Sequence, residues 1–243
     1  MRTDLVTAYL IHDWLTAHAP ALADQWEVPA HEQAMGMAGK LKGILDGVEA
    51  QVTGQNMVAH NAIAYWGLNK AVLVAGGTPT PLSPKVDELL FWSDANADAV
   101  AEAEAAGYSA QVVDVREPDD LGKLSVAESL VTTGLFHFLP DEAAKGMFGA
   151  LVTTDVKTIV FNHFRLPGDA PQDAALHEAI GQYVQLGISV YPRDSAMVET
   201  VIPKGWQITE ALPQGDVIRR DERVGEHFAD HIAWFDVYRI DRA

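Results

Sequence analysis

Four short apolar runs, separated by segments with helical patterning, constrain most strongly what this chain can fold into. They lie at residues 71–75, 89–92, 111–113 and 126–131, and they are too brief for helices. Buried strands that alternate with helical segments are typical of a parallel sheet with crossover helices. The pattern therefore predicts an α/β fold, in which ligands bind beyond the carboxyl ends of the strands where the strand order switches direction.

Glycines and acids follow these runs at the spacing of a nucleotide site. Gly76 and Gly77 come directly after the first run. Asp94 ends the second run, 18 residues after Gly76, and Asp114 ends the third. An acid about 20 residues after a glycine turn is where the hydroxyl pair of a ribose is held. The spacing predicts a nucleotide-type pocket at this edge of the sheet.

The segment from Val131 to Glu142 carries the most specific motif in the chain. It reads Val-Thr-Thr-Gly-Leu-Phe-His-Phe-Leu-Pro-Asp-Glu and is similar to the segment after strand four of class I S-adenosylmethionine-dependent methyltransferases. The order of features from about Asn56 to the C-terminus resembles that family. The resemblance implies a seven-stranded, mostly parallel sheet with a reversed last strand, helices on both faces, and S-adenosyl-L-methionine as the cofactor.

The resemblance also implies which residues hold the cofactor. The glycines would lie near its methionine portion, Asp94 would bind the ribose, and Asp114 would bind the adenine amino group. The full cofactor-binding set is Gly76, Gly77, Asp94, Asp114, Val115, Thr132 and Thr133. Each residue also has a plain structural interpretation. The glycines can mark an ordinary turn, Asp94 can cap a helix, Asp114 can be a surface acid, and the threonines can pack at the strand end.

The glycine turn departs from the family pattern. Val74 stands where the family has an acid, and Thr78 and Thr80 stand where it has glycines. Pro79 and Pro81 delay the start of the helix that is expected to follow, so the loop should be longer and stiffer than usual.

Two histidines are the candidate catalytic residues. Methyl transfer from a sulfonium is an in-line displacement, so the protein must mainly align donor and acceptor and, for an alcohol or amine, remove a proton. His137 follows the fourth strand and is the first candidate for a base or for positioning the acceptor. His163, expected just after the fifth strand, is the second. The alternative for His137 is a histidine packed between Phe136 and Phe138.

The first 68 residues are predicted to form an N-terminal helical cap of three helices, with an α/β domain at 69–243. The third helix, Gln55 to Trp66, should close at Gly67. In methyltransferases of this type such a segment often covers the substrate as a lid. The alternatives are that the helices cover the sheet edge or pair with a second copy in a homodimer.

The remaining elements follow from local patterns. A helix capped by Asn96 or Asp98 should end at Gly107, and another should start at Pro140. The other predicted elements are a third strand at 109–115, a fourth at 126–131, a fifth at 156–161, a helix at 171–186, and a late antiparallel pair at 205–208 and 231–240.

Composition narrows the classes of partner. A formal net charge of −17 speaks against nucleic acid, because binding phosphates needs a basic surface, and it fits a small-molecule acceptor better. The chain has no cysteine, which excludes disulfides and thiolate chemistry. No apolar run is long enough to cross a membrane and no signal sequence is visible, so we expect a cytoplasmic protein without a membrane partner.

Other catalytic and metal motifs are weak or missing. His227 and His231 are four apart, but the second opens a predicted strand, so no metal site is expected. A Gly-x-Gly-x-x-Gly fingerprint, a nucleophile elbow and a phosphate-loop motif are all lacking. The sequence thus favours an S-adenosylmethionine-dependent methyltransferase acting on an oxygen or nitrogen of a small molecule. The alternative is a protein of the same fold that no longer methylates and serves as a binding or scaffold subunit, or catalyses another reaction.

Overall fold

In the computed structural model, the described residues are 55–151, 155–167, 189–218 and 235–243, with residues 173, 174, 176, 177, 180 and 181. The chain divides into two compact units, one of residues 1–50 and 169–190 and the other of residues 51–168 and 191–243. The second unit holds nearly all of the described residues, including the helix at 55–66. The first two predicted cap helices, most of the predicted helix at 171–186 and the His227–His231 pair lie outside the described residues.

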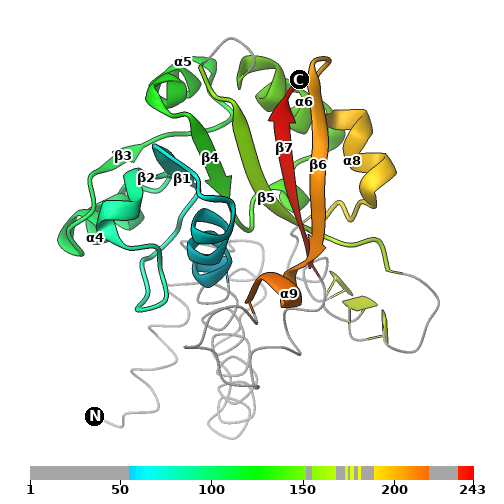
Figure 1. The fold of residues 1–243 in the computed structure, drawn as a ribbon, viewed down its shortest axis with the longest axis horizontal. Coiled ribbons are helices and arrows are strands. Elements are labelled where there is room, and N and C mark those ends of the chain that lie inside the picture. Colours follow the sequence, from blue (N-terminus) through cyan, green and yellow to red (C-terminus); the bar gives the residue numbers. More distant parts are fainter. Residues whose placement is uncertain are drawn as a thin grey trace, which may run out of the picture. The chain divides into compact units, whose positions relative to one another are not determined.

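A seven-stranded sheet in the order β3-β2-β1-β4-β5-β7-β6 forms the centre of the second unit (Figure 1). Strands β1 to β5 pair in parallel, and β7 runs antiparallel to both β5 and β6. The strands are β1 (Ala71–Val74), β2 (Leu89–Asp94), β3 (Ala110–Val112), β4 (Ser129–Thr132), β5 (Thr158–Phe164), β6 (Trp206–Pro213) and β7 (Phe235–Arg242). The predicted α/β sheet with a reversed last strand is confirmed.

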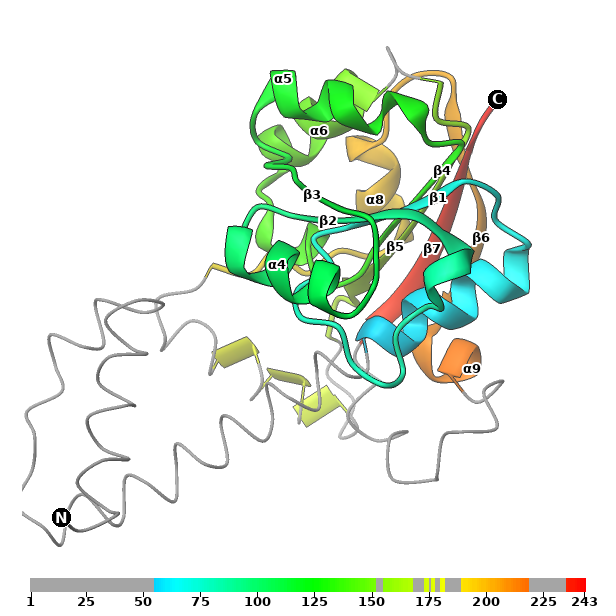
Figure 2. The same ribbon diagram turned by 90° about the vertical axis from the view of Figure 1, so that its left-hand side faces the viewer.

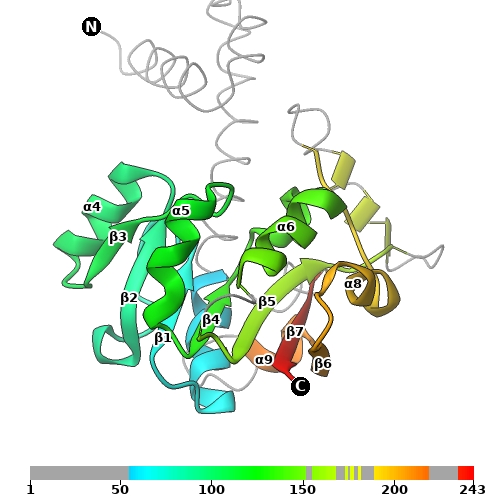
Figure 3. The same cartoon turned by 90° about the horizontal axis from the view of Figure 1, so that it is seen from above.

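Helices cover both faces of the sheet, as Figures 2 and 3 show. The helix at 55–66, α4 (Ala97–Ala105) and α9 (Gln214–Ile218) contribute to one apolar layer. The layer on the other face includes α5 (Pro118–Leu121), α6 (Asp141–Leu151) and α8 (Ser195–Val201). Successive strand residues alternate between the layers, so that Leu130 joins one and Val131 the other. Because both faces are buried, β1 and the middle of β4 and β5 are apolar, and the polar residues of β4 and β5 lie at or near the strand ends.

The register brings several strand ends to one level. Val74 pairs with Ser93 on one side and with Thr132 on the other, and Thr132 pairs with Phe161. The strand order switches direction between β1 and β4, which is where open α/β sheets bind ligands. The residues that follow these strands therefore share one edge of the sheet.

The predicted helix caps are confirmed. Gly67 adopts a left-handed conformation (φ +56°) after the helix at 55–66, and the Leu68 amide donates to the Ile63 carbonyl at 3.0 Å. This 6→1 hydrogen bond is that of a Schellman cap. Helix α4 begins at the Asn96 cap, whose side chain accepts a hydrogen bond from the Asp98 amide.

Several predicted strand boundaries are wrong; the first strand of the late pair, for example, continues to Pro213 rather than ending at 208. The fourth strand begins at Ser129 rather than 126, because residues 122–126 form the 3-10 helix η2 (Gly122–Val126). The third strand is shorter than predicted, at Ala110–Val112. The fifth strand continues to Phe164, so that His163 lies inside it rather than after it.

The helix expected after the glycine turn does not form. Residues 75–88 connect β1 to β2 with only a 3-10 turn, η1 (Val86–Glu88). Prolines 79, 81 and 84 lie within six residues and remove amide donors that a helix needs. The loop is instead held by side chains, because Asn56 Nδ2 donates to the Thr78 carbonyl at 2.9 Å and the Tyr108 hydroxyl donates to the Pro84 carbonyl at 2.6 Å.

Gly76 packs directly on the indole ring of Trp92, a side chain that is fully buried in β2. A Cβ atom at residue 76 would lie 2.4 Å from Trp92 Cε2 and Nε1. The indole also donates from Nε1 to the Gly77 carbonyl at 3.1 Å, which limits how far it can move. Trp92 therefore explains the need for glycine at residue 76 without any ligand.

We expect Gly76→Ala to lower the free energy of unfolding by ~1–3 kcal/mol, since the added methyl group must displace a buried ring. The same substitution at Gly146, an exposed position of α6 where an added Cβ would have no neighbour within 4 Å, should instead stabilise the protein by ~0.5–1 kcal/mol through helix propensity. Chemical denaturation of both variants measures the contrast. The cost at residue 76 should shrink in a Trp92→Phe background, and an equal cost in both backgrounds would contradict the packing argument.

Candidate functional site

Asp94 lies at the carboxyl end of β2 and contacts the glycine turn after β1. Its Oδ2 atom accepts a hydrogen bond from the Gly77 amide at 2.9 Å, and its Oδ1 atom accepts one from the Asn96 amide at 2.8 Å. A carboxylate has about four acceptor positions, so each oxygen retains capacity for a further donor. The side chain is only partly buried. The structure thus brings together two of the predicted cofactor-binding residues, Asp94 and Gly77.

Gly77 has the backbone that a ligand-facing turn needs. Its φ of +59° lies in the left-handed region, and no atom lies within 4 Å of the position that a Cβ would take. The space that a side chain at residue 77 would occupy is therefore empty, whereas the corresponding space at Gly76 is filled by Trp92.

Asp114 follows β3, next to the end of β2, but its carboxylate is engaged with a neighbour. The Val113 amide donates to the carbonyl of Asp94, the last residue of β2, at 2.9 Å. Asp114 is the next residue after this hydrogen bond. Arg116 donates from Nε to Asp114 Oδ1 at 2.9 Å and from Nη2 to Oδ2 at 2.6 Å. These hydrogen bonds lower the pKa of Asp114 to about 2. An adenine amino group would have to share this carboxylate with the arginine.

Val115 and the two threonines lie where the strand ends meet the core. Val115 packs against the apolar layer that includes Leu121. Thr132 and Thr133 are buried at the end of β4. The Thr132 hydroxyl has no hydrogen-bond partner among the described residues, which is unusual for a buried polar atom. An unpartnered hydroxyl at this edge is consistent with a ligand contact.

The turn after β4 is held by two amide side chains that the sequence did not single out. Asn162 Oδ1 accepts from the Gly134 amide at 2.7 Å, and Asn162 Nδ2 donates to Gln214 Oε1 at 2.7 Å. Both amide side chains are buried. Gly134 itself has a φ of +85°. This chain of hydrogen bonds joins β4, β5 and α9, and no local pattern in the sequence indicated it.

His137 lies in the short 3-10 helix η3 (Phe136–Phe138) and is fully buried. Its ring contacts three phenylalanines, with centroid distances of 4.1 Å to Phe138, 4.6 Å to Phe164 and 5.4 Å to Phe235. Neither ring nitrogen has a hydrogen-bond partner within the described part of the chain. Burial, with smaller effects of His163 and Arg193, holds the pKa of His137 well below its usual value. The imidazole is therefore neutral at pH 7.

His163 has both ring nitrogens occupied. Arg193 Nη1 lies 2.8 Å from His163 Nε2, and because an arginine only donates, Nε2 must be the acceptor. The proton is then on Nδ1, which donates to the Phe164 carbonyl at 2.9 Å. Burial is the main cause that lowers the pKa of His163 to about 4. The catalytic role predicted for His163 has no support in this geometry, because no nitrogen is free to accept a substrate proton.

Metal and membrane features are not found where the structure describes the chain. Among the described residues, no group of three or more histidines, aspartates and glutamates is placed to hold a metal ion. Within the same residues, no helix combines the length and apolar character that crossing a bilayer requires.

Comparison with known proteins by sequence gives no match, either to a family model or to a curated protein. Comparison with solved structures gives many matches. A DUF574 family protein from Streptomyces avermitilis matches with a TM-score of 0.60 at 12% identity, over 91% of each chain. The mitomycin 7-O-methyltransferase MmcR matches with a TM-score of 0.52 at 14% identity, over 100% of this chain and 69% of that one. An S-adenosylmethionine-dependent methyltransferase from Anabaena variabilis matches with a TM-score of 0.50 at 14% identity, over 75% of this chain and 82% of that one.

The fold is that of the S-adenosylmethionine-dependent methyltransferases. The sheet order and the reversed β7 agree with what the sequence resemblance implied. At this level of identity the likeness is one of fold. The methyltransferase fold of this chain differs from the sequence expectation in the β1–β2 connection, where a proline-bearing loop replaces the crossover helix.

The lowered pKa of His163 predicts that the free energy of unfolding decreases in mild acid. Its pKa is about 4 in the folded protein and 6.5 in an unfolded chain, so the unfolded state binds more protons as the pH falls below about 6.5. Between pH 7 and pH 5 this histidine alone should lower the free energy of unfolding by ~2 kcal/mol. Urea denaturation across this range should give a shallower pH dependence for His163→Gln. An unchanged slope would mean that His163 is not held neutral by burial.

Proposed function

We propose that this protein is an S-adenosylmethionine-dependent methyltransferase that acts on an oxygen or nitrogen of a small molecule. The observation that carries the proposal is the Asp94 carboxylate, which ends β2 and is hydrogen-bonded to Gly77, in the loop that follows β1 beside the switch point of a methyltransferase-type sheet. Support also comes from MmcR, a structural neighbour named as a 7-O-methyltransferase of mitomycin, and from OxaC, a neighbour with a TM-score of 0.50 that was crystallised with SAH and oxaline.

The residues at this edge fit the cofactor in most positions. Asp94 keeps acceptor capacity on both oxygens, which suits the two hydroxyls of a ribose. Gly77 leaves open space for a close approach of the methionine portion, and Thr132 contributes a buried hydroxyl without a partner among the described residues. Asp114 fits less well because Arg116 holds its carboxylate, so adenine recognition would depend more on the backbone around Val113 to Val115.

The protein's own residues supply alignment rather than a nucleophile. When bound, the cofactor provides an electrophilic methyl group on a sulfonium, and an in-line displacement needs no covalent bond to the protein. Asp94 and the glycine turn would orient one reactant, and the segment after β4 would orient the other. His137 is uncharged, and the one of its two unpartnered nitrogens that carries no proton can accept a hydrogen bond from an alcohol or amine. Because the pKa of His137 is low, this histidine is better suited to orient the acceptor than to hold a proton taken from the acceptor.

A second candidate function is a protein of this fold that binds a ligand or partner without methylating. The β1–β2 loop favours this candidate, because Gly76 is used for packing on Trp92 and the loop has prolines where a helix would begin. The two functions differ in the step after binding, since only an enzyme converts the donor to its demethylated product. Function depends on the site rather than on the fold, so the two must be separated by measurement.

Isothermal titration calorimetry with S-adenosylmethionine tests the proposal. We expect saturable binding that Asp94→Ala weakens by ~1–3 kcal/mol, because charge-assisted hydrogen bonds to the ribose are lost. Asp98→Ala is the matched control, since Asp98 lies nearby in the first turn of α4 and is exposed. Thermal unfolding of each variant confirms that it is folded.

The outcomes separate the two candidates. Absence of heat and of a thermal shift at millimolar S-adenosylmethionine would reject the methyltransferase proposal. Binding without release of S-adenosylhomocysteine, in the presence of a panel of small alcohols, phenols and amines, would favour the binding protein. Equal losses for the Asp94 and Asp98 variants would show that the ribose is not held at the end of β2.

A further inference from the structure

Arg193 is a buried cation whose N–H groups are all used inside the protein. Its Nε and Nη2 atoms donate to Asp141 Oδ1 at 3.0 and 2.7 Å, and Nη2 also donates to the Leu139 carbonyl at 2.7 Å. Its Nη1 atom donates to the Phe136 carbonyl at 3.2 Å and to His163 Nε2 at 2.8 Å. A guanidinium has five N–H donors and no acceptor. These five contacts leave no donor for an anionic ligand, so Arg193 acts on the protein's own geometry.

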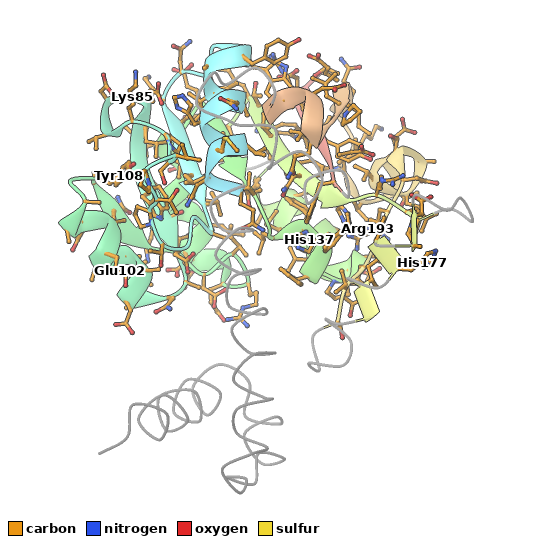
Figure 4. The ribbon with its side chains drawn as sticks, turned by 90° about the horizontal axis from the view of Figure 1, so that it is seen from below. Lys85, Glu102, Tyr108, His137, His177 and Arg193 are labelled. Carbon is orange, nitrogen blue, oxygen red and sulfur yellow. The ribbon has the colours of Figure 1, made fainter. Side chains whose placement is uncertain are left out.

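The contacts of Arg193 fasten the segment after β4 at both ends. Phe136 is the first residue of η3, and Asp141 is the first residue of α6. Main-chain hydrogen bonds reinforce this fastening, because the Tyr191 amide donates to the His137 carbonyl at 2.7 Å. The backbone of His137 is thus fixed from two sides. Figure 4 shows His137 and Arg193 near each other, away from Tyr108 and Lys85.

The His137 side chain is the exception in this hydrogen-bonded segment. Its ring is fully buried, yet both nitrogens lack a partner among the described residues. A buried polar group without a hydrogen bond costs ~1–3 kcal/mol, and such groups in native proteins often mark a site of binding or catalysis. The segment is therefore fixed in a geometry that is unfavourable for its own imidazole, unless another molecule supplies the missing hydrogen bond.

Burial is the main reason that both histidines of this region are neutral, and the positive charge of Arg193 adds to its effect. His137 faces the His163 ring, at a centroid distance of 6.1 Å, and lies in the field of the Arg193 cation. His163 faces Arg193 directly, with Asp141 from α6 as the counter-charge and Asp236 of β7 as its register partner. Because Nη1 of Arg193 donates to Nε2 of His163, the proton of the neutral ring must lie on Nδ1.

We propose that Arg193 is a positioning residue for methyl transfer: it clamps residues 136–141 so that the imidazole of His137 is presented to a hydroxyl or amine of the acceptor. The reaction in this statement rests on the function proposed above, whereas the clamp is a property of the protein alone. Since no donor of Arg193 is left over, Arg193 does not bind an anionic group of the acceptor. The fitting substrate class is a small molecule that carries an alcohol, phenol or amine.

Histidine NMR tests the clamp without any substrate. In the full-length protein, long-range ¹H–¹⁵N spectra report the tautomer and pKa of each ring, and His137→Gln and His163→Gln supply the assignments. In the native protein His163 should be the Nδ1–H tautomer. Arg193→Gln should raise the pKa of His163, because the cation that opposes its protonation is removed. Asp141→Asn should lower that pKa, because the favourable negative charge is removed.

The opposite signs distinguish a clamp from general destabilisation, which would shift both variants in the same direction. Asp141→Asn is also the safeguard if Arg193→Gln fails to fold, since the Asp141 side chain is half exposed. Arg239→Gln is the matched control: Arg239 pairs with Asp241 on β7, away from both histidines, and its loss should change neither ring. Unchanged His163 signals in both test variants, or a native Nε2–H tautomer, would overturn the proposal.

Kinetics test the second half of the proposal. Arg193→Lys keeps the charge but has at most three of the five donors, so kcat should fall ~10- to 100-fold while the Kd for S-adenosylmethionine is unchanged. If the NMR results hold and no methylation occurs with any acceptor, the proposed function fails and the clamp stands. If methylation occurs and Arg193→Lys retains the native kcat, the positioning role fails and the proposed function stands.

Discussion

The burial of both faces of the sheet is the constraint on which the rest of this structure depends. Apolar layers on either side cover the middle of the central strands, so polar groups collect at or near the strand ends. The strand order reverses between β1 and β4, so the connections that follow these two strands leave in opposite directions. This leaves room for a ligand at the carboxyl ends of the strands. Asp94, Gly77 and Thr132 are found at that edge because each follows or ends a strand that enters the core.

The β1–β2 connection shows how packing can replace a regular element. Where a crossover helix was expected, residues 75–88 form a loop that hydrogen bonds from Asn56, Trp92 and Tyr108 hold in place. Gly76 serves the packing of the Trp92 indole, while the adjacent Gly77 remains open and binds Asp94 through its amide. Two neighbouring glycines thus have different physical roles, one steric and one conformational.

The two histidines that the sequence singled out differ in whether their ring nitrogens have hydrogen-bond partners. His163 lies within β5, where Arg193 and the Phe164 carbonyl satisfy both of its nitrogens. His137 lies beyond β4 among aromatic rings, and its nitrogens have no partner in the described residues. Arg193 connects the two, since its guanidinium bonds His163 and the carbonyls that flank His137.

The sequence by itself determined the elements whose signals are local. Apolar runs located the strands, glycine and asparagine located the helix ends, and the Thr-Thr-Gly-Leu-Phe-His segment located the polar end of β4. It did not reveal the missing helix after β1, the extension of β5 through His163, or the role of Arg193. These were decided by tertiary contacts, such as the hydrogen bond between Arg193 and Phe136, 57 residues apart. Local patterns record which residues prefer a helix, strand or turn, but a buried side chain finds its hydrogen-bond partners only when distant segments have packed together.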